Sequence, residues 1–265
     1  MSKRDAWVAA ETIRVGDTSI LALSDGVFTM PPDFLSDPRA HADLSDREGH
    51  VHLPIGAFLF PGDEPLLVDL GFGPGPRNDL LTGGHLIDQL RAVECRPEDV
   101  RTVALTHPHP DHIGWLATPD GRQWFPGATV VLAEADWEYF VDERGGEMDD
   151  HIHVALLDLH ARGRVELLSA ERTLAPHVTA LPAPGHTPGH TVFAVHDGSE
   201  RAVLLGDALY CPQQLGHSDW EAVSDVDPLL AARTRVMLER DLEEHDALAV
   251  GAHFPGLRAG RVLRR

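Results

Sequence analysis

The sequence predicts an α/β protein, and three observations support this fold class. The chain has 265 residues, of which 43% are hydrophobic, and this length suits one large domain with a buried core. Short β-branched, apolar segments alternate with segments that carry helical spacing. No apolar run approaches the roughly 18 residues that a membrane span requires. We therefore expect a single domain over residues 1–265, with residues 30–50 as a loop decoration.

The N-terminal part of the chain predicts strands and one long loop. Residues 12–29 indicate a pair of strands with Gly26 marking the turn between them. Residues 30–50 are rich in Pro, Asp and Ser and predict a loop, which is usually functional when it is this long. Residues 55–71 indicate a hairpin around the sequence Pro-Gly-Asp at 61–63.

The rest of the chain alternates between helical and strand-like segments. The clearest helix spans residues 227–246, where Asp227 is the expected N-cap and Pro228 the first helical residue. The other expected elements are a helix within 86–100 that stops at Pro97, a buried strand at 100–105, a strand running into a helix at 128–140, a helix within 141–164, and several short strands within 163–206.

The heptapeptide THPHPDH at 106–112 is the strongest functional signal in the sequence. It places His107, His109, Asp111 and His112 directly after the expected strand at 100–105. Imidazole nitrogens and carboxylates are the usual ligands of a divalent metal such as zinc. Because side chains alternate along extended backbone, His107 and His109 should point roughly the same way. Metal binding explains this spacing better than a polar turn with solvated histidines.

Three further polar residues, His186, Asp207 and His253, follow apolar runs and complete a set of seven candidate ligands. Such residues lie at the rim of a sheet, where active sites are commonly built on loops. One count assigns His107, His109 and His186 to a first metal. It assigns Asp111, His112 and His253 to a second metal, with Asp207 bridging the two.

These motifs, THPHPDH, GHTPGH, GDALY and GAHFPG, resemble the metallo-β-lactamase superfamily and occur in that family's order. The resemblance covers about residues 54–254 and implies an αββα sandwich, in which two mixed sheets lie face to face between helices. It also implies the same seven ligands, and a supporting role for Asp69 behind the metal-binding loop. Asp207 stands where one class of true β-lactamases has cysteine, so antibiotic hydrolysis is not the first expectation.

The resemblance implies a dinuclear hydrolase, in which metal-bound hydroxide opens lactones or cleaves esters. Two divalent ions are expected, with zinc favoured and Mn, Co or Fe as alternatives. The catalytic roles fall to Asp111, Asp207 and Tyr210, of which Asp207 can also carry a proton to the leaving group. Tyr210 follows Asp207 by three residues, as in the N-acyl-homoserine-lactone lactonases, where a tyrosine points at the lactone carbonyl. Packing alone explains Tyr210 about equally well.

Three alternatives stay open from the residues. The N-terminal segment and the ending GAHFPGLRAGRV also resemble the methyl parathion hydrolase-like branch, which cleaves organophosphate triesters. An iron-dependent oxidoreductase could use the same histidine-carboxylate ligands. A binding domain without catalysis is the third alternative, and the complete ligand set argues against it.

Charge, histidines outside the motifs and cysteine content complete the expectations. The net charge is −20, and no cluster of basic residues outside the C-terminal tail could neutralise phosphates, so we expect no nucleic-acid partner. We expect a small-molecule substrate and leave a homodimer open. His151 and His153 are expected to line the surface or a cleft, and His190 to play a supporting role. With two cysteines, Cys95 and Cys211, and no visible signal peptide, a cytoplasmic protein is expected.

Overall fold

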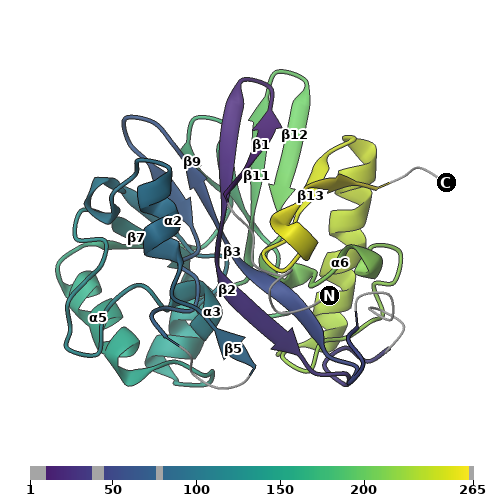
Figure 1. Cartoon of the computed structure of the whole chain (residues 1–265), viewed down its shortest axis with the longest axis horizontal. Coiled ribbons are helices and arrows are strands. Elements are labelled where there is room, and N and C mark those ends of the chain that lie inside the picture. The colour runs from purple at the N-terminus through teal and green to yellow at the C-terminus, as the bar shows by residue number, and fades with distance from the viewer. Residues whose placement is uncertain (1–9, 38–44, 76–79, 263–265) are drawn as a thin grey trace.

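Two mixed β-sheets pack face to face, and helices cover their outer faces (Figure 1). The computed structural model describes residues 10–37, 45–75 and 80–262. One sheet has the strand order β1-β2-β3-β4-β6-β7-β8, with β5 paired to β2, and the other has the order β14-β13-β12-β11-β10-β9. The expected αββα sandwich is confirmed.

The first sheet and its connections occupy the N-terminal part of the chain, residues 11–168. Its elements are β1 (Glu11–Val15), β2 (Thr18–Met30), β3 (Val51–Phe60), β4 (Leu66–Val68), β5 (Leu81–Thr82), α2 (Leu86–Ala92), a 3₁₀ turn (Pro97–Asp99), β6 (Thr102–Ala104), α3 (Pro110–Ile113), β7 (Thr129–Ala133), α4 (Glu134–Asp136) with a π-helical turn (Trp137–Asp142), α5 (Asp150–Ala161) and β8 (Val165–Leu168).

The second sheet follows in the C-terminal half. Its elements are β9 (Arg172–Ala175), β10 (Val178–Pro182), β11 (Thr191–Asp197), β12 (Glu200–Leu204), short 3₁₀ turns at Gly206–Ala208 and Pro212–Gln214, α6 (Pro228–Glu244), β13 (Leu248–Val250), a 3₁₀ turn at Pro255–Leu257 and β14 (Gly260–Arg261).

Three apolar layers hold the sandwich together. Alternating side chains of the two sheets, such as Phe58 and Phe193, fill the space between them. The outer face of the first sheet packs against α2 and α5, and the outer face of the second packs against Leu242 of α6. This alternation explains why β3 is buried along its whole length. No helix in the described ranges has the length and apolar character of a membrane span.

Parallel pairing within each sheet places several strand ends at one edge. Strands β4, β6 and β7 run parallel to one another, as do β12 and β13. The carboxyl ends of parallel strands meet at the same edge of a sheet, and ligands are commonly bound there. The loops after β6, β12 and β13 are the segments that carry THPHPDH, GDALY and GAHFPG.

The expectation that Gly26 marks a turn between two strands was wrong. The turn lies at Gly16 between β1 and β2, whereas β2 runs through Gly26 with a shift of register between Ser24 and Gly26. A Cβ atom at Gly26 would lie 1.8 Å from the Thr82 carbonyl oxygen, so glycine allows β5 to approach β2 closely. A glycine inside a strand therefore marks a bulge here and not a hairpin.

The other expected elements form, with shifted boundaries. Helix α2 ends at Ala92, five residues before Pro97, which instead begins a 3₁₀ turn. Helix α6 is confirmed, because Asp227 caps it by accepting a bond from the Leu230 N–H (2.9 Å) and Pro228 is its first residue. Of the expected loop at 30–50, residues 38–44 lie outside the described residues.

Asp25 connects the bulge in β2 to three neighbouring segments. Its carboxylate accepts bonds from the N–H groups of Phe72 (2.7 Å), Gly84 (3.2 Å), His85 (3.0 Å) and Leu86 (2.8 Å), and from the Trp115 indole (2.7 Å). The side chain is completely buried. One carboxylate therefore orders the start of α2, the loop after β4 and the segment after α3.

We predict that Asp25→Asn lowers the free energy of unfolding by about 2–4 kcal/mol, because an amide cannot accept all five bonds and leaves buried donors unpaired. Urea unfolding followed by circular dichroism measures this change. Asp63→Asn, at an exposed position in the β3–β4 turn, is the matched control and should change stability by about 0.5 kcal/mol at most. Equal stability of the two variants would contradict the role given to Asp25.

Candidate metal centre

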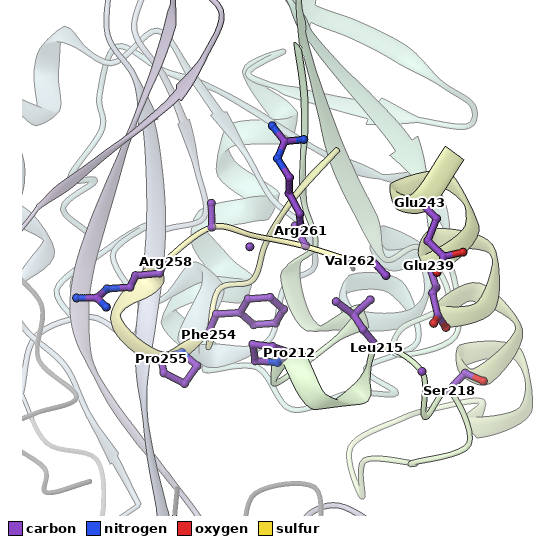
Figure 2. A pocket seen from close by; sticks show the side chains of 14 residues that line it. Pro212, Leu215, Ser218, Glu239, Glu243, Phe254, Pro255, Arg258, Arg261 and Val262 are labelled. Atoms are coloured by element: carbon purple, nitrogen blue, oxygen red, sulfur yellow. The ribbon is translucent and has the colours of Figure 1, made fainter. Parts of the chain in front are cut away.

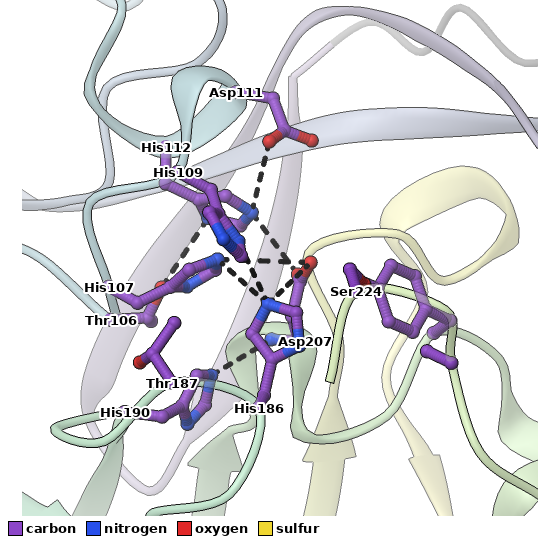
Figure 3. A network of polar contacts seen from close by, with 12 residues as sticks. Thr106, His107, His109, Asp111, His112, His186, Thr187, His190, Asp207 and Ser224 are labelled. Carbon is purple, nitrogen blue, oxygen red and sulfur yellow. Dashed lines mark hydrogen bonds and ion pairs between the residues drawn. The ribbon is translucent and has the colours of Figure 1, made fainter. Parts of the chain in front are cut away.

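The structure brings all seven predicted ligands together at one edge of the sandwich. Figure 3 labels all of them except His253. They form three overlapping groups whose ligand atoms lie within 4.8 Å of one another: His107, His109 and His186; His107, His112 and Asp207; and Asp111, His112 and His253. Five of the seven are buried, whereas His109 and Asp111 are partly exposed. The open side of the cluster is therefore the side of His109 and Asp111.

Asp207 lies between two halves of the cluster. Its Oδ1 is 3.1 Å from His112 Nε2 and 3.2 Å from His253 Nε2. Its Oδ2 faces His186 Nε2 (3.8 Å) and His107 Nε2 (4.0 Å). Each Asp207 oxygen thus faces one half of the cluster, which is the arrangement required of a carboxylate that bridges two cations.

Hydrogen bonds on the far side of His107 and His186 leave their Nε2 lone pairs facing the cluster. His186 Nδ1 is 3.1 Å from Asp225 Oδ1, so this nitrogen carries the proton and donates it. The Thr106 hydroxyl donates to Asp69 Oδ2 (2.8 Å) and accepts from His107 Nδ1 (3.0 Å). This network leaves no proton on the Nε2 atom of His107 or of His186. The two Nε2 atoms still lie only 3.2 Å apart.

In the other half of the cluster, hydrogen bonds from Nδ1 likewise leave the Nε2 lone pairs of His112 and His253 facing the centre. His112 Nδ1 donates to Asp69 Oδ2 (2.8 Å), and His253 Nδ1 donates to the Pro54 carbonyl oxygen (2.8 Å). Their Nε2 atoms, like Asp207 Oδ1, are buried and have no hydrogen-bond partner among the described residues. Buried polar atoms without a partner are costly and rare. Convergent lone pairs next to a carboxylate fit divalent cations, which accept such pairs.

Burial and charge shape the titration of these histidines. Burial, reinforced by the neighbouring imidazoles, lowers the pKa of His107 and His109 well below the usual value, so both stay neutral. Burial also acts against protonation of His112, but the charges of Asp207, Asp69 and Asp111 together outweigh it and raise the pKa of His112 well above the usual value. The Asp207 side of the cluster is therefore the side that attracts positive charge.

Tyr210 borders the cluster, as its position in GDALY suggested. Its ring stacks on His253 with centroids 5.4 Å apart and an interplanar angle of 5°, and its hydroxyl is 3.0 Å from Ser224 Oγ. Burial, together with the charge of Asp207, raises the pKa of Tyr210 well above its usual value. The phenol therefore stays protonated and able to donate.

Several supporting residues escaped the sequence analysis, and others were expected. Asp225 was missed because it lies outside every motif, and Thr106 was missed because a hydroxyl residue at the start of THPHPDH carries no ligand signal of its own. Asp69 contacts His112 as expected, and His190 Nε2 accepts the Asp207 N–H (3.1 Å). His151 and His153 lie on α5, where His153 Nε2 is 2.9 Å from the Val141 carbonyl oxygen, and neither belongs to the metal-type groups found in the described ranges.

A cavity of about 840 Å³ lies away from this cluster, between α6 and the C-terminal segment (Figure 2). Its lining includes Pro212, Phe254 and Arg261 but none of the seven predicted ligands. Cys211, next to this region in sequence, has a thiol whose pKa burial raises to about 11. That value suits a packed side chain better than a nucleophile.

The family follows from a match to residues 53–253, which fit the model described as the metallo-beta-lactamase superfamily. The chain belongs to this superfamily. The N-acyl homoserine lactonase AttM of Agrobacterium fabrum is 28% identical over 197 residues, which cover 64% of this chain and 64% of AttM. The chain therefore spans slightly less than two thirds of the length of this curated relative.

Solved structures support the same fold. The hydrolase AbOPH of the beta lactamase superfamily superposes with a TM-score of 0.83 at 24% identity, covering 97% of this chain and 94% of AbOPH. AidC, a dizinc quorum-quenching lactonase, gives a TM-score of 0.80 at 21% identity, covering 98% of this chain and 96% of AidC. At these identities the likeness establishes the architecture alone.

We predict that the protein reconstituted with zinc carries about two ions per chain, because two groups of convergent lone pairs share one carboxylate. Asp207→Ala should lose at least one of them, since each half loses an oxygen ligand. Elemental analysis of dialysed protein measures the stoichiometry, and the exposed Asp63→Ala variant serves as the control. Parent protein that retains no metal would contradict this assignment.

Proposed function

We propose that the protein is a hydrolase that opens lactones or cleaves esters, with N-acyl homoserine lactones as the favoured substrates. The observation that carries the proposal is the Asp207 carboxylate, whose two oxygens face two separate groups of imidazoles. The lactonase relatives support the substrate class, because AttM is named for this activity. The residues that would hold two cations are the seven of the cluster.

When bound, two divalent cations there would supply Lewis acidity and lower the pKa of a water molecule toward neutrality. The chain's own contribution is preorganisation. Hydrogen bonds to Asp69, Asp225 and Pro54 fix the rings of His112, His186 and His253, so no reorientation is needed during the reaction. Asp207 is the group we assign to proton transfer to the leaving oxygen.

Aromatic side chains border the cluster and favour a substrate with apolar parts. Phe34 contacts Phe28 with ring centroids 5.2 Å apart and Tyr210 with centroids 4.9 Å apart. Phe28 in turn lies 5.7 Å from the His253 ring. Val223 and Val226, which lie on either side of Ser224 and Asp225 in the sequence, are 73% and 43% exposed. An acyl chain that leaves the cluster on this side would meet apolar surface.

A substrate screen tests this proposal. Protein reconstituted separately with Zn, Mn, Co and Fe is assayed against N-acyl homoserine lactones, simple lactones, aryl esters and phosphotriesters. We expect lactone hydrolysis to give the highest kcat/KM. If phosphotriesters give the highest kcat/KM instead, they replace lactones as the proposed substrate class. Oxygen consumption with the iron form, without any hydrolysis, would refute the proposal.

We predict that Tyr210→Phe lowers kcat for lactones by about 10²–10³-fold at most, with a smaller change in KM, because a phenol that donates to a developing oxyanion acts mainly in the transition state. Both metals and the fold should be retained, as elemental analysis and thermal unfolding would show. Ser224→Ala, which removes the partner of the phenol but not the phenol, should cost much less. Parent-like lactone kinetics of Tyr210→Phe would reduce Tyr210 to a packing residue.

A further inference from the structure

His186 has a buried carboxylate behind it that the sequence motifs do not include. The ring nitrogen that faces away from the cluster, Nδ1, lies 3.1 Å from Asp225 Oδ1. The side chains of His186 and Asp225 are 1% and 0% exposed. Asp225 lies in the segment between the 3₁₀ turn Pro212–Gln214 and helix α6, far from every motif in the sequence.

The second oxygen of Asp225 is held from another direction. Asp225 Oδ2 lies 3.2 Å from Arg235 Nη1 and accepts the Ala222 N–H at 3.1 Å. Arg235, on α6, is 2% exposed, and its Nε donates to the Ser218 carbonyl oxygen (3.0 Å). A buried guanidinium is costly unless a negative charge lies beside it. Asp225 and Arg235 therefore offset each other's burial and fix the carboxylate behind His186.

The backbone of the same segment also holds the His186 loop. The Val226 N–H donates to the His186 carbonyl oxygen (3.0 Å), and the Asp227 N–H donates to that of Gly185 (2.9 Å). A Cβ atom at Gly185, where φ is +134°, would lie 2.3 Å from the Ala231 nitrogen of α6. Backbone and side chain of His186 are thus both positioned by residues 225–231.

The other half of the cluster has a separate support of the same chemical kind. Asp69, which directly follows β4, accepts from His112 Nδ1 at 2.8 Å and also from the Thr106 N–H at 2.8 Å. Asp69 follows a strand of the first sheet, whereas Asp225 and Arg235 belong to the segment that covers the second sheet. Asp69 also reaches His107 through the Thr106 hydroxyl, which donates to Asp69 and accepts from His107 Nδ1. Asp225, in contrast, contacts His186 alone among the seven candidate ligands in the described ranges.

We propose that Asp225, fixed by Arg235, is a positioning residue for His186 and sets the cation affinity of the His107–His109–His186 half without acting on the half that contains His112. This inference rests on the cation-binding part of the proposed function but on none of its substrates. A carboxylate on Nδ1–H fixes the ring and makes Nε2 a better electron-pair donor, and loss of such a partner typically lowers metal affinity about 10–100-fold.

The experiment compares Asp225→Asn, Asp69→Asn and the double variant in the full-length protein. Zinc binding is titrated against a competing chelator, which yields two dissociation constants, and thermal unfolding is followed for each metal-free protein. We expect Asp225→Asn to weaken one ion about 10–100-fold and leave the other within about threefold. Asp69→Asn and the double variant should both weaken both ions, because Asp69 supports His112 directly and His107 through Thr106. Asp219→Asn, at an exposed position of the same segment, is the matched control and should change neither constant.

Arg235→Lys is a second variant that keeps the buried charge but loses the forked geometry, and it should weaken the same ion by a smaller factor. Either of two results would overturn the inference: zinc constants that stay at parent values while the metal-free protein unfolds at a lower temperature, or an equal weakening of both ions by Asp225→Asn. Lactone turnover is measured on the same samples. A parent that binds two ions without hydrolysing any ester would refute the proposed function and leave the assignment of Asp225 intact.

Discussion

The candidate centre depends on the placement of one carboxylate, that of Asp207. The backbone that presents it turns at Gly206, where φ is +51° and a Cβ atom would lie 2.8 Å from His190 Nε2. The Asp207 N–H then donates to that same nitrogen at 3.1 Å. Burial lowers the pKa of His190 to about 3, so the ring stays neutral near pH 7 and keeps the lone pair that accepts this bond. Glycine and histidine together fix where the carboxylate points.

The candidate centre buries polar groups without partners among the described residues, whereas the rest of the molecule is stabilised by buried apolar side chains. The sandwich buries apolar side chains in three layers, whereas the centre buries unpaired ring nitrogens beside a carboxylate. Desolvation of such groups costs free energy that hydrogen bonds normally recover. Local violations of this kind are expected at functional sites, where a ligand supplies the missing partner. The surrounding supports, Asp69 and Asp225, hold the ligands in place at this cost.

Sequence reasoning could predict the candidate ligands that the structure brings together, because they follow strands at short spacing. THPHPDH and GDALY come directly after β6 and β12, so pattern and position agree. Asp225 and Arg235 could not be found in this way, since Asp225 meets His186 from 39 residues away and its own segment has no periodicity. Asp25 was hidden for a related reason. The sequence Ser-Asp-Gly at 24–26 is typical of a turn, and only the approach of Thr82 shows that it forms a bulge with a structural carboxylate.

The segments that would set the proposed substrate preference differ from those that carry the candidate ligands. Two segments from opposite ends of the chain pair beside the cluster: the Ser36 N–H donates to the Glu221 carbonyl oxygen (2.8 Å), and the Val223 N–H donates to that of Phe34 (2.9 Å). This pairing brings Phe34 onto Tyr210, while Ser224 contacts the Tyr210 hydroxyl from the other segment. The ligand motifs contain neither segment. On the proposed function, a chain with the same seven candidate ligands but different residues here would keep the reaction class and change the substrate, because loops beside a site commonly carry its specificity.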